Sequence, residues 1–277
     1  MKKRVITALV GAPLTIILCI WAPLWLFGVV LGILCAVATA EFMRCVNSKQ
    51  KLHRRTVFWP MASAFAMPFW LSVRGEGASL YTLSYYLFFM LFLEYIVSYE
   101  RKDERMDLPL ILAGLVAGMV MPIMLSSLVR IGLRVHGGRL NMFLPFMIAF
   151  SCDTGAFFTG KSIGKHKLVP RLSPNKTVEG AIGGLVFATV GALIYGGILT
   201  ACGFEVNYFR LTVYSFLGGI ACELGDLSFS AVKRSCGIKD YGSILPGHGG
   251  ILDRFDSMYF TAPLLEILTF WLPAIIV

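Results

Sequence analysis

Long apolar runs separated by short polar segments dominate the chain. A helix needs about 20 mostly apolar residues to cross a bilayer, and the chain contains such runs repeatedly. The pattern predicts nine spans, at residues 5–21, 23–42, 57–73, 79–98, 108–128, 142–159, 178–201, 208–232 and 257–277. We therefore expect an all-α polytopic membrane protein.

The composition supports this class and excludes two others. Of the 277 residues, 57% are hydrophobic and only 15% are charged, whereas soluble domains carry about a quarter charged residues. So little polar surface excludes a soluble enzyme and a nucleic-acid-binding domain. The seven cysteines lack paired spacing, which supports neither a disulfide framework nor a zinc site.

The distribution of basic residues predicts the orientation. With the N-terminus inside, 20 of the 25 Lys and Arg residues fall in cytoplasmic segments, as the positive-inside rule requires. Only the expected loop at 129–141, with three Arg, departs from the rule. The basic start resembles a signal peptide, but the apolar stretch continues to Phe42, so we expect an uncleaved first span. We expect a bacterial-type inner (plasma) membrane protein whose net charge of +9 needs no nucleic acid partner.

Polar residue types divide the chain into two regions. Residues 1–140 carry five expected spans and are interpreted as a lipid-facing, dimerisation or scaffold region. Residues 141–277 include two expected cytoplasmic loops, 160–177 and 233–256, that combine Gly, Pro, His, Lys, Asp and Ser. The second region is therefore predicted to be catalytic.

Ionisable residues inside membrane spans are costly and are usually paired or functional. On the helix of the span at 208–232, continued to its cytoplasmic end, a polar stripe occupies an arc of about 100° and consists of Glu223, Asp226, Ser230, Lys233 and Arg234. We expect it to line an aqueous cavity that Asp153 also faces. An internal ladder between Asp226 and Ser230 or Lys233 is the alternative. Glu41 lies near a span end and is expected to reach the interface.

The segment from Lys239 to Asp256 combines glycines, bases and acids. Gly-rich backbone presents N–H groups to phosphate oxygens, and Lys and Arg neutralise phosphate charge. Carboxylates among those bases suit a divalent cation that also contacts phosphate. The combination predicts metal-assisted phosphoryl or nucleotidyl transfer.

A second sequence pattern associated with phosphate binding lies between the wrong secondary-structure elements. Residues 155–162 match the Walker A pattern literally, but that pattern needs a strand before it and a helix after it, and here it ends an apolar span. Close helix packing is the preferred interpretation of Gly155 and Gly160. Downstream, Thr177 is expected to cap the next helix, whose N-terminus would form a second anion site.

These motifs together resemble the signature of the CDP-diacylglycerol synthases, or phosphatidate cytidylyltransferases. The resemblance covers roughly residues 145–260 and includes Asp153-x-Gly155-Ala156 and the run from Ser173 to Gly180. Its main part reads Ser230-x-x-Lys233-Arg234, then Lys239-Asp240, then Leu245-Pro246-x-His248-Gly249-Gly250-x-x-Asp253-Arg254-Phe255-Asp256. The first five spans resemble the family only in being apolar helices.

The resemblance implies an enzyme that joins CTP and phosphatidic acid, with Mg²⁺ as cofactor and K⁺ as a second candidate ion. A homodimer is compatible with it. By position, it places the metal centre on Asp226 and Asp253, with Asp256, Asp153 and Glu223 as further candidates. The other expected catalytic residues are Lys233, Arg234 and His248, the last as a phosphate ligand, a proton donor or a structural residue. Expected substrate-binding residues are Lys239, Arg254, Ser230, Lys176, Asn175, Ser173, Gly249 and Gly250.

Two other function classes stay open. An acidic stripe in a helix bundle would also suit a cation transporter, which predicts ion flux without nucleotide. A CTP-dependent polyprenol or phytol kinase would share the C-terminal chemistry, but it transfers only the γ-phosphate of CTP.

The basic asymmetry leads to a topological prediction. A reporter that is active only in the cytoplasm should give a signal when fused to the N-terminus and none when fused to the C-terminus. Activity of the C-terminal fusion would contradict an odd number of spans.

Overall fold

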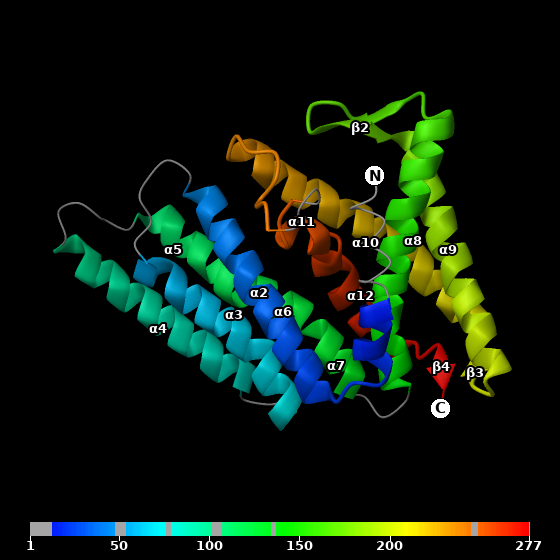
Figure 1. The fold of residues 1–277 in the computed structure, drawn as a ribbon, viewed down its shortest axis with the longest axis horizontal. Coiled ribbons are helices and arrows are strands. Elements are labelled where there is room, and N and C mark those ends of the chain that lie inside the picture. The colour runs from blue at the N-terminus through cyan, green and yellow to red at the C-terminus, as the bar shows by residue number, and fades with distance from the viewer. Residues whose placement is uncertain are drawn as a thin grey trace. The chain divides into compact units, whose positions relative to one another are not determined.

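The computed structural model describes residues 13–47, 54–75, 79–100, 107–133, 137–244 and 249–276. Its regular structure is almost entirely helical (Figure 1). The chain divides into two compact units, residues 1–130 with 235–255 and residues 131–234 with 256–277. The segment 235–255 thus groups with the N-terminal helices, and the division differs from the expected one at residues 140/141.

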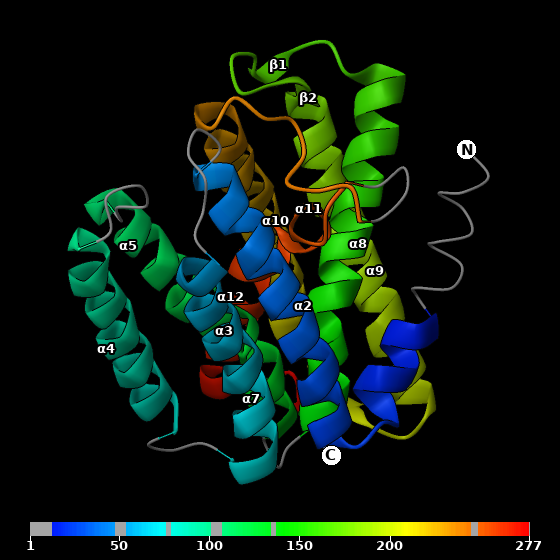
Figure 2. The same ribbon diagram turned by 60° about the vertical axis from the view of Figure 1, so that its left-hand side comes forward.

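The first unit is a set of apolar helices. Residues 13–20 are helical. The helices that follow are α2 (Leu24–Val46), α3 (Arg54–Arg74), α4 (Ser79–Tyr99), α5 (Leu108–Leu115), the π-helix η1 (Val116–Val120), α6 (Met121–Leu125) and α7 (Ser127–Leu133). The last residues of α7 belong to the second unit. The short helix α11 (Leu252–Phe255) lies beside α2 (Figure 2).

The π-helical turn is matched to its neighbours. At η1 the backbone follows the wider i→i+5 pattern of a π-helix, and backbone polar groups must be satisfied inside a membrane protein. The Thr39 hydroxyl on α2 donates to the Ala117 carbonyl at 2.8 Å. A β-carbon at Gly118 would lie 2.6 Å from Cα of Pro60 on α3. The turn therefore lies against both α2 and α3.

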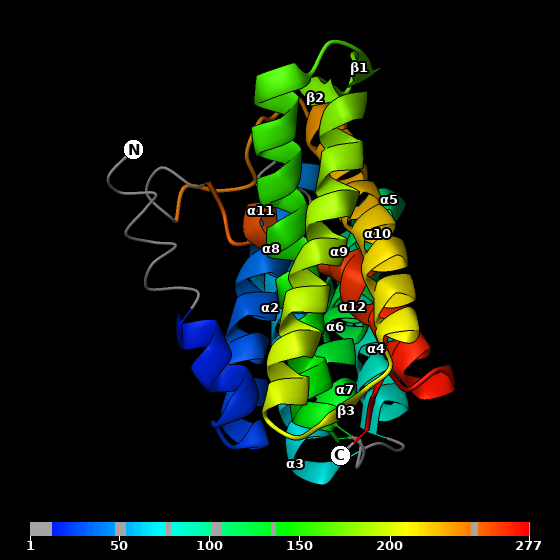
Figure 3. The same cartoon turned by 90° about the vertical axis from the view of Figure 1, so that its right-hand side faces the viewer.

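The second unit places two small strand pairs at opposite ends of long helices (Figure 3). Its elements after α7 are α8 (Gly138–Ile163), β1 (Lys167–Val169), β2 (Ser173–Thr177), α9 (Val178–Ala201), β3 (Glu205–Val206), α10 (Tyr208–Ser235), α12 (Met258–Trp271) and β4 (Ile275–Ile276). Strand β1 pairs antiparallel with β2, with Lys167 opposite Thr177. Strand β3 pairs antiparallel with β4, with Glu205 opposite Ile276.

Small residues let α8 and α9 pack closely. A β-carbon at Gly184 would lie 3.0 Å from the Cys152 carbonyl oxygen, and one at Gly155 would lie 2.9 Å from the Gly183 carbonyl oxygen. Without a hydrophobic effect between helices in lipid, such close backbone approach stabilises helix pairs. The interpretation of Gly155 as a packing position is confirmed, and residues 155–162 lie inside α8 rather than in a P-loop.

Most expected spans correspond to single helices, and the polytopic helical class is confirmed. Among the described residues, six helices are long and apolar enough to cross a membrane: Leu24–Val46, Thr56–Arg74, Leu80–Tyr99, Leu108–Leu133, Gly138–Ile163 and Val178–Ala201. The expected span 208–232 corresponds to α10, which carries charged residues. Much of the expected span 5–21 lies outside the described residues, so the count of nine stays a prediction.

Two expected boundaries were wrong. The expected loop at 129–141 is largely helical, because α7 continues to Leu133 and α8 begins at Gly138. Arg130 lies within that helical stretch, and its Nη2 donates to the Ile123 carbonyl and the Ser127 hydroxyl. The expected span 257–277 forms a helix of only 14 residues. Pro273 cannot extend the helix, and β4 follows.

The α8–α9 contact generates a stability prediction. Gly184→Val should lower the free energy of unfolding by about 1–3 kcal/mol, because its side chain would overlap Cys152 on α8. Gly197→Val is the matched control on the same helix, since a β-carbon there meets nothing within 4 Å. Thermal unfolding in detergent measures both variants. Equal stability of the two would contradict the packing role.

Candidate active site

Ionisable side chains from four segments of the second unit form a carboxylate–lysine cluster. Its members are Asp153 on α8, Lys176 on β2, Glu223, Asp226 and Lys233 on α10, and Asp256 just before α12. These residues are far apart in the sequence, and the fold of one unit brings them together.

Lys176 is at the centre of the cluster. Its Nζ lies 2.6 Å from Glu223 Oε2 and 2.7 Å from Asp226 Oδ2. The three side chains are 22%, 13% and 30% exposed, respectively. Burial alone would lower the pKa of the Lys176 ammonium, but the two carboxylates outweigh it and hold that pKa above its ordinary value. Lys176 is therefore a fixed cation between two acids.

Asp256 and Lys233 form the second part of the cluster. Both are buried, and Lys233 Nζ lies 4.0 Å from Asp256 Oδ2. Burial and the Asp226 charge raise the pKa of Asp256 to about 7, against the opposing effect of Lys233. Gly225 lets the backbone at Asp256 lie close to α10, because a β-carbon at Gly225 would lie 2.8 Å from the Asp256 carbonyl oxygen.

Three further contacts involve side chains of α10. The Ser230 hydroxyl donates to Asp226 Oδ1 at 3.3 Å, so one rung of the alternative ladder is present. The Cys222 thiol donates to Asp153 Oδ1 at 3.6 Å, which ties α10 to α8. The Arg234 guanidinium reaches the Leu172 carbonyl of the β1–β2 turn at 3.5 Å. The stripe thus contacts other segments of its unit as well as itself.

Local structure at the start of α9 positions Lys176. The Thr177 hydroxyl accepts the Gly180 N–H at 3.1 Å, which confirms the predicted helix cap. Glu179 accepts the backbone N–H groups of Lys165 and His166 and pairs with His166 Nδ1 at 2.6 Å. These bonds hold the β1–β2 hairpin on the helix end. Ser173 and Asn175 lie on the same strand, and Asn175 is exposed.

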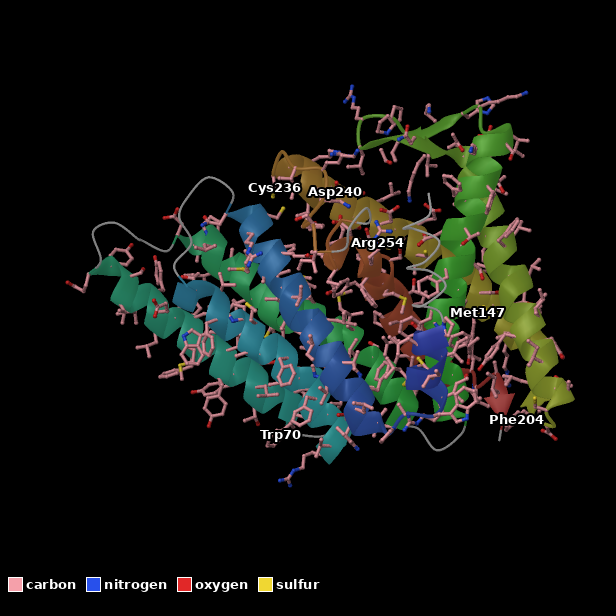
Figure 4. All side chains as sticks on the ribbon, in the orientation of Figure 1. Trp70, Met147, Phe204, Cys236, Asp240 and Arg254 are labelled. Atoms are coloured by element: carbon pink, nitrogen blue, oxygen red, sulfur yellow. The ribbon has the colours of Figure 1, made fainter. Side chains whose placement is uncertain are left out.

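In the first unit, Asp253 organises the Gly-rich segment. Its Oδ2 accepts the Tyr241 N–H at 2.8 Å and the Gly250 N–H at 2.9 Å, and the residue is buried. Gly249 adopts φ +80°, which non-glycine residues rarely adopt. Figure 4 labels Asp240 and Arg254 on this segment. Arg254 and Lys239 are exposed and their phosphate-binding roles stay predictions, while His248 lies outside the described residues.

Sequence reasoning missed the partner of Glu41. The expectation that it reaches the interface was wrong, because the residue is only 1% exposed. Its carboxylate accepts the N–H groups of Ile251 at 3.1 Å and Leu252 at 2.8 Å. A lone acid in an apolar run was the available signal, but the pattern held no information about a partner some 210 positions away.

The expected metal ligands lie in both units. Asp153, Glu223, Asp226 and Asp256 belong to the second unit and Asp253 to the first, so a cation shared by Asp226 and Asp253 stays a prediction. Among the described residues, no group of three His, Cys, Asp or Glu is already arranged around a metal position. The donors fit a hard cation chemically, because Asp226 and Glu223 already hold the ammonium of Lys176 between their oxygens.

The fold and this cluster define a polytopic helical membrane protein with paired acids and bases in its C-terminal half. A model of the cytidylyltransferase family matches residues 2–272, and the chain belongs to that family.

Curated bacterial proteins named phosphatidate cytidylyltransferase are similar to this chain. The protein from Staphylococcus aureus (strain COL) is 50% identical over 123 residues, which cover 44% of this chain and 46% of that protein. The protein from Bacillus subtilis (strain 168) is 47% identical over 131 residues, covering 47% and 48%, respectively. In these matches the chain spans just under half the length of its relatives.

The central ion pairs generate a prediction. Lys176→Met should lower the free energy of unfolding by about 1–2 kcal/mol, because two close carboxylates lose their shared cation and partial exposure reduces the penalty. Adding Glu223→Gln should recover part of the loss by removing one of the opposed charges. Thermal unfolding of the single and double variants measures this. A double variant less stable than Lys176→Met would contradict the pairing.

Proposed function

We propose that this protein transfers the cytidylyl group of CTP to phosphatidic acid, giving CDP-diacylglycerol and pyrophosphate. The single observation that carries the proposal is the pairing of Lys176 with Glu223 and Asp226. It places a fixed cation and two acids together in a membrane protein of the cytidylyltransferase family. The names of the similar bacterial proteins support the same substrates.

The reaction needs no nucleophile from the protein. An oxygen of the phosphatidate phosphate attacks the α-phosphorus of CTP, a new oxygen–phosphorus bond forms, and the bond to the β-phosphate breaks. Pyrophosphate leaves with the electron pair of that bond. The protein therefore has to bring together two anionic substrates, orient them and offset their charge.

The basic residues suit this task by position. Lys233 and Arg234 lie in the last turn of α10, and the β1–β2 hairpin lies close enough for Arg234 to reach it. We propose that these two residues, with the exposed Lys239 and Arg254 of the Gly-rich segment, bind the phosphates of CTP and phosphatidate.

Asp226 and Glu223 are the residues of the cluster that would hold Mg²⁺, with Asp256 and Asp153 as neighbours, and Asp253 of the Gly-rich segment stays a further proposed ligand. When bound, Mg²⁺ offsets charge on the α-phosphate and on the departing pyrophosphate. In the structure Lys176 supplies positive charge to the same acids. We propose that its ammonium also binds a phosphate group of the substrates. K⁺ stays a candidate second ion.

We place the reaction at the cytoplasmic face of the membrane. Phosphatidate keeps its acyl chains in the bilayer and presents its phosphate at the interface. The β1–β2 hairpin and the basic end of α10 are polar segments expected on the cytoplasmic side by the positive-inside count. CTP would reach them without crossing the membrane.

The test uses labelled CTP with the purified protein and phosphatidic acid vesicles. Label in the α-phosphate should appear on lipid, and label in the γ-phosphate should leave in pyrophosphate. Asp226→Asn should lower the rate at least about 100-fold, because it removes a charge from the cluster. Glu205→Gln, an exposed acid on β3 of the same unit, should leave the rate unchanged. Transfer of the γ label to lipid would instead indicate a kinase.

A further inference from the structure

Glu41 is the one acidic residue of helix α2, and it is buried. It lies in the last turns of α2 and is 1% exposed. Burying an ionised carboxylate is costly unless charge or hydrogen bonds compensate it. The Glu41 carboxylate therefore needs hydrogen-bond donors or a cation that offset the cost of its burial.

The donors lie at the start of helix α11. The Glu41 oxygens each accept one backbone N–H, from Ile251 at Oε1 and from Leu252 at Oε2. The first N–H groups of a helix have no acceptor within it, and Leu252 is the first residue of the four-residue helix α11. A carboxylate from a distant helix therefore caps α11.

Glycines surround the Glu41 carboxylate closely. A β-carbon at Gly250 would lie 2.5 Å from Oε2 and 2.6 Å from Oε1, and one at Gly242 would also meet Oε1. On the neighbouring turn, the rings of Phe42 and Tyr241 stack with centroids 6.4 Å apart. A side chain at either position would therefore displace the Glu41 carboxylate.

Two carboxylates divide the amides of this segment between them. Asp253 takes the N–H of Gly250, and Glu41 takes those of the next two residues, Ile251 and Leu252. Asp253 joins two parts of the Gly-rich segment to each other, whereas Glu41 joins the segment to helix α2. The backbone that carries Asp253 and Arg254 is therefore fixed from both sides.

We propose that Glu41 is a positioning residue for the reaction: from α2 it sets the backbone of residues 250–252 and thereby the direction of the Asp253 and Arg254 side chains. This inference rests on the proposed function. It assigns a role in the reaction to a helix from the part of the chain interpreted above as a scaffold.

The test replaces Glu41 in the full-length protein. Glu41→Gln keeps the size but puts an amide N–H₂ against one of the two backbone donors. We expect kcat to fall at least about tenfold while the KM for phosphatidic acid changes less than about threefold. Glu41→Asp keeps both acceptor oxygens on a shorter side chain, so its kcat should lie between those of the wild type and Glu41→Gln.

A second measurement does not depend on turnover. Hydrogen exchange of the peptide covering residues 249–255 should be faster in Glu41→Gln than in the wild type, because one of the two amides loses its acceptor. Thr39→Val is the matched control on the same helix, since Thr39 donates a buried hydrogen bond to η1 instead. It should destabilise the protein without changing kcat or exchange at 249–255.

The outcomes separate the positioning role from a structural one and from failure of the proposed function. The positioning role is overturned by an unchanged kcat in folded Glu41→Gln, or by a loss that Thr39→Val matches at equal stability. If Glu41→Gln does not fold, Glu41→Asp decides: unchanged kcat and unchanged exchange at 249–255 overturn the role. A wild-type protein that makes no cytidylyl lipid overturns the proposed function, and the positioning role with it.

Discussion

Buried and half-buried carboxylates between the helices are the constraint on which the rest of this structure depends. In a low-dielectric interior an unpaired carboxylate is costly, so each must meet a cation or several N–H donors. Glu223 and Asp226 meet Lys176, whereas Glu41 and Asp253 each meet two backbone N–H groups. These requirements bring a hairpin to α10 in one unit and a Gly-rich segment to α2 in the other.

The same constraint explains the distribution of small residues. A polar segment can satisfy a buried acid only if its backbone comes within hydrogen-bond distance, and a side chain at the contact would prevent that. Gly242 and Gly250 lie against the Glu41 carboxylate, and Gly225 lies against the backbone at Asp256. Several glycines near the candidate site thus have a packing reason. A Gly-rich motif alone therefore does not distinguish phosphate binding from close backbone packing.

The sequence predicted the elements better than their contacts. Apolar run length identified residues 178–201 as a helix with the observed bounds, and the cap at Thr177 followed from residue type. Helix periodicity correctly placed Glu223, Asp226 and Ser230 on one stripe, because that relation is local. The π-helical turn and the partners of Lys176 and Glu41 depend on which helices pack together, and no local pattern records that. The end of α7 and the start of α8, which occupy most of the expected 129–141 loop, were missed because the apolar runs on either side end before them.

The position of Glu41 also changes how the N-terminal half is understood. The family resemblance seen in the sequence begins near residue 145, so the earlier helices were interpreted only as apolar spans. Yet a helix that served only to anchor the protein would gain nothing from a buried acid, because a leucine there would cost less. The acid is compensated by N–H groups of the segment that carries Asp253 and Arg254. The stability of α2 alone therefore does not explain an acid at position 41. The hydrogen bonds that Glu41 accepts from residues 251 and 252, which order the Gly-rich segment, do explain it.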